Sequence, residues 1–63
     1  MTIDEQREWL DNHKDEVGEW ILVNDKWYGK DSYEDYLLSD DPKVTPLGIY
    51  PPFMTAIIEQ YEK

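Results

Sequence analysis

The stretch that decides the fold is Trp20-Ile21-Leu22-Val23-Asn24-Asp25-Lys26-Trp27-Tyr28. Two runs rich in β-branched and aromatic residues flank an Asn-Asp pair, and both of these residues tolerate the positive φ angles of a tight turn. The pattern predicts a β-hairpin with a two-residue turn, in which Leu22 faces Trp27 on the same side as Trp20. A three-residue loop that includes Lys26 would shift the register, and the sequence leaves both turns open.

Before the hairpin, the sequence predicts one amphipathic helix over residues 3–17. Thr2 and Glu5 have the spacing of a capping box, which places the first helical residue at position 3. Apolar residues then recur every seven positions, and neighbouring side chains widen this stripe; the stripe consists of Ile3, Gln6, Trp9, Leu10, His13 and Val17. Gly18 follows the last apolar position and can adopt the left-handed conformation that ends a helix.

After the hairpin, we expect a short helix that is capped by Asp31 or Ser32 and ends near Ser39. Tyr33, Tyr36 and Leu37 are predicted to lie on one side of this helix, and Glu34 and Asp35 on another. Residues 40–52 contain all four prolines of the chain, so we expect an ordered loop with brief extended pieces. Whether one of these pieces adds an edge strand to the hairpin is left open.

A last helix is predicted to begin with Pro52 in its first position and to pack on the hairpin. It has a broad apolar stripe formed by Phe53, Met54, Ile57, Ile58 and Tyr61. The fold class is therefore α+β: residues 1–63 form one small domain in the order helix, β-hairpin, short helix, Pro-rich loop, helix. We expect the core to consist of Trp9, Trp20, Trp27, Phe53 and Tyr61. The remaining tyrosines exceed what so small a core can hold, so one or two of them should be exposed.

Charge is the second informative property of the sequence. The 63 residues include 15 acidic and 6 basic side chains, for a formal net charge of −9, and all of this net charge lies before residue 42. Such a surface repels nucleic acid and anionic membranes, so we expect neither as a direct ligand and expect a basic protein as partner. The longest apolar run has four residues and no basic leader begins the chain, which favours a cytoplasmic location.

Residues for enzymatic chemistry are scarce. The chain has no cysteine, one histidine and three widely separated glycines, so it forms neither a phosphate-binding loop nor a Cys or paired-His zinc site. The acidic run from Asp11 to Asp15 lacks the glycine that a calcium loop needs at its sixth position. We therefore expect no catalysis, no cofactor and no bound metal.

The acidic residues of the first helix are regularly spaced, at positions i, i+4, i+7 and i+11; they are Asp4, Glu8, Asp11 and Asp15. This spacing places them in one row opposite the apolar stripe, with about 4.5–6 Å of axial rise between neighbours. A second acidic group lies on and after the short helix and consists of Glu34, Asp35, Asp40 and Asp41. If the fold aligns the two groups, their charge density is comparable to that of a nucleic-acid backbone.

A short, cysteine-free acidic chain with acidic rows and surplus aromatic residues resembles small phage-encoded inhibitors of host nucleic-acid enzymes. These include DNA mimics, anti-restriction proteins and anti-CRISPR proteins, and the resemblance is one of composition. It implies a non-catalytic protein that occupies the basic surface of a nucleic-acid-processing enzyme. From the spacing of the acids, we expect the group at residues 4–15 to make the primary contacts and the group at residues 34–41 secondary ones, and we expect Tyr33 to add an aromatic anchor.

Two other interpretations stay open. In the first, the acidic row is a solvated helix face that only keeps a small protein soluble. In the second, the chain is a structural or assembly protein that forms a homodimer through the hairpin edge and exposed aromatic residues.

Overall fold

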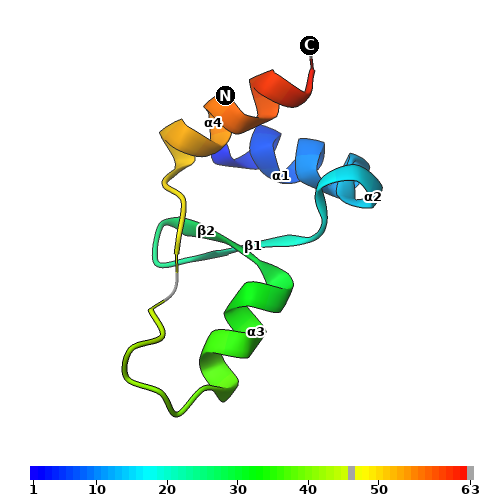
Figure 1. Cartoon of the computed structure of the whole chain (residues 1–63). Coiled ribbons are helices and arrows are strands. Elements are labelled where there is room, and N and C mark those ends of the chain that lie inside the picture. The colour runs from blue at the N-terminus through cyan, green and yellow to red at the C-terminus, as the bar shows by residue number, and fades with distance from the viewer. Residues whose placement is uncertain (46, 63) are drawn as a thin grey trace.

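The computed structural model describes residues 1–45 and 47–62. The elements are two consecutive helices, a hairpin and two further helices; their bounds are α1 (Ile3–Asn12), α2 (Lys14–Val17), β1 (Trp20–Val23), β2 (Lys26–Gly29), α3 (Lys30–Leu38) and α4 (Pro51–Tyr61). The predicted α+β class and element order are confirmed. In Figure 1, α1 and α4 lie together on one side of the hairpin, whereas α3 extends from its other side. The molecule is elongated, with extents of 38 × 22 × 19 Å.

The hairpin has the predicted two-residue turn. Asn24 and Asp25 have φ angles of 50° and 64°, and the antiparallel register pairs Leu22 with Trp27. Beyond the strands, the backbone N–H of Lys30 donates to the carbonyl of Glu19 at 2.9 Å, and the two side chains form an ion pair of 3.0 Å. The alternative three-residue loop is thus excluded.

The capping box at the start of α1 is also confirmed. The backbone N–H of Glu5 donates to Thr2 Oγ1 at 3.2 Å, and the backbone N–H of Thr2 donates to Glu5 Oε1 at 3.1 Å. Hydrogen bonding of Thr2 to the carboxylate, first from its backbone N–H and then from its side chain, favours the ionised form and so lowers the pKa of Glu5. The start of the chain's first helix is therefore set by local chemistry.

The predicted continuous helix over residues 3–17 is wrong at one position, because His13 separates α1 from α2. Its backbone has φ −120° and ψ 15°, outside the helical range. The carbonyl of Trp9 accepts from the backbone N–H of His13 at 3.1 Å and from its Nδ1 at 2.8 Å, while the same N–H also reaches Leu10 O. The imidazole stacks on the Trp9 ring at 4.0 Å. The side chain thus competes for a helix carbonyl and tightens the last turn of α1.

The core lies between α1, α4 and β2. It consists of Trp9, Leu10, Trp27, Met54 and Ile58, and half-buried apolar side chains such as Trp20 and Leu22 pack against it. Two aromatic residues that the sequence assigned to the core are exposed instead: Phe53 is 64% exposed and Tyr61 also faces solvent. The helix α4 packs against α1 and β2, and the side chains of its stripe that become fully buried are Met54 and Ile58.

The helix α3 differs from prediction in two ways. It begins directly after β2 with Gly29 at the N-cap, and no side chain caps it, so neither Asp31 nor Ser32 has the expected role. Leu37, expected on the same side as Tyr33 and Tyr36, is 62% exposed, whereas those two tyrosines are half-buried. Tyr33 contacts the sheet, because its ring lies 5.3 Å from that of the buried Tyr28.

The loop before α4 makes one short addition to the sheet. Trp27 N donates to Ile49 O at 2.7 Å, and Ile49 N donates to Trp27 O at 2.8 Å, which forms an isolated antiparallel bridge on the outer edge of β2. The helix α4 then begins at Pro51, one residue before the predicted start. Position 46 lies outside the described residues.

Candidate protein-binding surfaces

The acidic row on the first helix is partly preserved. Asp4, Glu8 and Asp11 are exposed on α1 at the predicted helical spacing. Asp15 is also exposed but belongs to α2, so the break at His13 interrupts the row before its fourth member. The carboxylate of Asp11 lies 3.6 Å from Lys14 Nζ, which neutralises part of the charge at this end.

The second acidic group lies on α3 and the loop that follows it. Glu34 and Asp35 are exposed on the helix, and Asp40 is exposed just after it. Asp41 also helps to shape the loop, because its Oδ1 accepts from the backbone N–H of Lys43 at 2.9 Å. Such Asx turns fix the direction of the chain after a helix.

The fold does not bring the two acidic groups together. Figure 1 shows α1 and α3 on opposite sides of the hairpin, and the loop after α3 runs along the α3 side. Tyr33 lies with the second group, but it is half-buried against Tyr28 and 6.5 Å from the Tyr36 ring. Its role in the structure is thus to attach α3 to the sheet.

Sequence reasoning missed the exposed apolar side chains on α3 and on the loop that follows it. Leu38 is 83% exposed and Leu47 is 90% exposed, and Leu37 and Val44 are exposed as well. One signal was available: adjacent residues on a helix point about 100° apart, so Leu37 and Leu38 could not both face a narrow contact with the sheet. We call this region the α3 surface; it comprises Glu34, Asp35, Leu37, Leu38, Asp40, Asp41, Val44 and Leu47.

A groove of about 330 Å³ adjoins the α3 surface. Tyr28 and Tyr36 line one part of it, and Val44 and Leu47 from the loop line another. Asp35 contributes a carboxylate to the lining. The groove therefore combines aromatic and aliphatic walls with negative charge.

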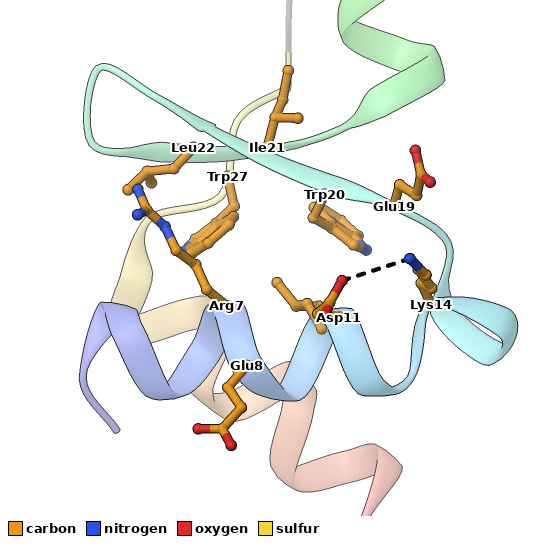
Figure 2. Close-up of a pocket in the computed structure, with 10 residues that line it drawn as sticks. Arg7, Glu8, Asp11, Lys14, Glu19, Trp20, Ile21, Leu22 and Trp27 are labelled. Atoms are coloured by element: carbon orange, nitrogen blue, oxygen red, sulfur yellow. Dashed lines mark ion pairs between the residues drawn. The ribbon is translucent and has the colours of Figure 1, made fainter.

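A larger groove of about 620 Å³ lies on the other side of the hairpin, between α1 and β1. Figure 2 shows Trp20, Leu22 and Trp27 in the space between the helix and the strand, with Arg7 and Asp11 reaching up from α1. Glu8 also borders the groove, although its carboxylate is directed away from it in the same view. We call it the β1 groove, because its upper border is the outer edge of β1.

Within residues 1–45 and 47–62, no three acidic or histidine side chains come close enough together to hold a metal ion. At the end of the hairpin, Glu19 and Lys30 form an ion pair that shifts the pKa of both groups. The hydrogen bond and the charge of Lys30 lower the pKa of Glu19, and the hydrogen bond and the charge of Glu19 raise the pKa of Lys30. In the described part of the chain, no helix has the length and apolar character that crossing a membrane requires.

Comparison with known proteins finds no family model that matches the chain and no significant match among curated proteins or solved structures.

Proposed function

We propose that this chain is a non-catalytic protein-binding domain that occupies a basic surface of a partner protein. The observation that carries the proposal is the α3 surface, where exposed leucines lie among acidic residues. Leu37 and Leu38 are 62% and 83% exposed although they are large aliphatic side chains, and Glu34 and Asp35 precede them on the same helix. Apolar groups gathered at the surface of a small acidic protein are typical of binding sites.

The two kinds of side chain have different roles in this proposal. The leucines enter an apolar depression of the partner and supply affinity, because their burial removes apolar area from water. The carboxylates lie around them, accelerate association with a basic surface and disfavour acidic proteins as partners. A partner with an apolar pocket surrounded by Lys and Arg side chains is complementary to both the leucines and the carboxylates.

Nucleic-acid-processing enzymes are the partner class that this chemistry favours, because their clefts are lined with basic residues. The chain would then act as an inhibitor, in the manner of a DNA mimic, by competing with nucleic acid for the cleft. The α3 surface would make the primary contact. The shorter row on α1, formed by Asp4, Glu8 and Asp11, lies on the other side of the hairpin and would contribute mainly to steering.

Two matched variants test the proposal. One replaces the four acids of residues 4–15, Asp4, Glu8, Asp11 and Asp15, with the corresponding amides. The other does the same for Glu34, Asp35, Asp40 and Asp41. Each changes the net charge from −9 to −5, so a general loss of charge affects both equally. Immobilised wild-type chain and both variants capture proteins from a lysate, and each captured protein is purified and titrated against a labelled DNA duplex.

The proposal predicts that a captured basic protein binds the duplex, that the wild-type chain displaces the duplex, and that the variant of residues 34–41 loses this competition. The variant of residues 4–15 should compete with a slower association rate. Added salt should weaken the complex between the chain and its partner. Equal competition by both variants, or competition unaffected by either, would contradict the assignment of the α3 surface.

A further inference from the structure

The outer edge of β1 presents backbone groups that the hairpin does not use. In a two-residue hairpin the positions that flank the turn exchange hydrogen bonds, and the alternate positions point outward. The bond from Lys30 N to Glu19 O fits this alternation, so Ile21 and Val23 direct their N–H and C=O groups toward β2. Trp20 and Leu22 therefore direct theirs away from the hairpin.

The two edges of the hairpin differ in how they are covered. On β2, the outward groups of Trp27 are paired with Ile49. Among the residues that the structure describes, no backbone group pairs with the outward groups of Trp20 or Leu22. The strand is short, but its sequence Trp-Ile-Leu-Val contains neither of two other features that prevent edge pairing, a charge or a proline.

We propose that β1 pairs with β1 of a second copy of this chain, in an antiparallel arrangement centred on Ile21. In this register Trp20 exchanges hydrogen bonds with Leu22 of the second copy, and Ile21 faces its own counterpart. All four outward positions are then paired, two on each strand. The two hairpins become one four-stranded sheet, and a two-fold axis passes between the two Ile21 residues.

Two of the five charged residues that border the β1 groove, Arg7 and Asp11, are placed so that they can pair across this two-fold axis. In Figure 2, Arg7 lies toward the Leu22 end of the groove and Asp11 toward the Trp20 end. Antiparallel pairing reverses the second copy, so Arg7 of one copy lies on the side of Asp11 of the other, twice per dimer. Within the described residues the ion pairs are Asp11–Lys14 and Glu19–Lys30, and Arg7 takes part in neither.

Pairing would also cover apolar surface that the single chain leaves partly in water. Trp20 and Leu22 are half-buried and point into the β1 groove, which has a volume of about 620 Å³. In the dimer, the same two side chains of the second copy lie beside them on the continuous sheet face. The β1 groove is therefore large enough to accept Trp20 and Leu22 of the second copy.

The rival occupant is an extended basic segment of another protein, which could add to the same edge. The two occupants differ in their response to salt. Two copies with a net charge of −9 each repel one another at long range, so salt should strengthen the dimer, whereas it should weaken binding of a basic segment. The dimer is independent of the proposed function, because it uses β1 and leaves the α3 surface free.

The first test uses the wild-type chain. Sedimentation equilibrium up to millimolar concentration should show a monomer–dimer equilibrium that shifts toward dimer with added salt. Amide hydrogen exchange should slow with concentration at Trp20 and Leu22. The amides of Ile21 and Val23 are internal controls, because they are bonded within the hairpin at every concentration. A monomer at all concentrations, or slowing at all four amides alike, would overturn the proposal.

The second test uses charge at the two-fold axis. Ile21→Lys and Ile21→Glu each place like charges opposite one another in a homodimer, so each variant alone should be monomeric. An equimolar mixture should form heterodimers, because Lys then faces Glu. The same changes at the exposed Leu38 are matched controls and should leave the wild-type equilibrium unchanged. If the mixture fails to associate, the register centred on Ile21 is overturned. If either variant fails to fold, the hydrogen-exchange measurement on the wild-type chain decides whether β1 pairs with β1 of a second copy.

Discussion

Trp27 Nε1 donates a 2.8 Å hydrogen bond to Gln6 Oε1, and both side chains are fully buried, with exposures of 1% and 0%. The amide nitrogen of Gln6 in turn donates to Pro51 O at 2.8 Å and to Thr55 Oγ1 at 2.7 Å. One glutamine thereby connects β2 with α1 and α4, and its carbonyl and amide groups both have partners. Such a satisfied buried network stabilises one arrangement of the three elements.

We expect Trp27→Phe to destabilise the protein more than Trp9→Phe does. The first change leaves Gln6 Oε1 buried without a donor, at a cost of about 1–3 kcal/mol beyond the lost packing. The second removes an indole nitrogen that is buried and has no hydrogen-bond partner in the described structure. Urea denaturation of both variants measures the difference. Equal losses in the free energy of unfolding would contradict the importance of this hydrogen bond.

Gly48 provides a test of how the loop contacts the sheet. A Cβ at this position would lie 2.8 Å from Lys26 Cβ and from Tyr28 Cζ, so Gly48→Ala must displace the loop or the strand. We expect a loss of about 1–3 kcal/mol, as for other overpacking changes, and faster amide exchange at Ile49. Gly29→Ala is the control, because the nearest atom to its added Cβ is Ser32 Oγ at 3.7 Å. A smaller loss for Gly48→Ala than for the control would count against the contact.

The exposed leucines of α3 should contribute little to stability. Because Leu37 and Leu38 are largely in water, changing both to Gln should alter the free energy of unfolding by no more than about 0.5 kcal/mol per site. Glutamine is chosen because its helix propensity is similar to that of leucine. Leu10→Ala, in the core, should cost about 2–5 kcal/mol. Thermal unfolding compares the variants, and a large loss from the α3 pair would place these leucines in a packed interface.

The capping box should give a small acid dependence of stability. The pKa of Glu5 in the folded protein lies below its unfolded value of 4.5, because the backbone and side chain of Thr2 hydrogen-bond to the carboxylate. The ionised group therefore stabilises the fold above pH 4.5, and this contribution is lost as the pH falls through the lowered folded pKa. Glu5→Gln keeps an acceptor oxygen but cannot titrate.

The measurement is the difference in free energy of unfolding between wild type and Glu5→Gln as a function of pH. This difference should favour wild type above pH 4.5 and shift toward the variant at lower pH. Glu8→Gln, which removes one exposed acid of α1 outside the capping box, corrects for the change in net charge. A difference that does not change below pH 4.5 would show that Glu5 gains no stability from its ionised form.

Local interactions let the sequence alone determine much of this fold. The Asn24-Asp25 pair predicted the hairpin and favoured a two-residue turn because both residues tolerate positive φ angles, and the structure then decided between the two registers that the sequence left open. The capping box of Thr2 and Glu5 fixed the start of α1, and Gly18, at φ 82°, ended α2. The exposure of the acidic residues was also predictable, because isolated charges are too costly to bury.

Tertiary packing decided the rest. His13 interrupts a helix that periodicity predicts to be continuous, because its ring stacks on Trp9 and bonds to the Trp9 carbonyl. Phe53 belongs to an apolar stripe yet stays in water, since the area of contact between α4 and its neighbours limits how much of the stripe is buried.

The candidate surfaces depend on the same distinction. The sequence indicated which side chains are charged or apolar, but the direction in which each helix leaves the hairpin is a property of the packed molecule. That direction separates the acids of α1 from those of α3 and leaves the β1 edge without a described partner. Hydrophobic patterning determines which face of an element avoids water, whereas the available neighbours determine how much of that face is covered.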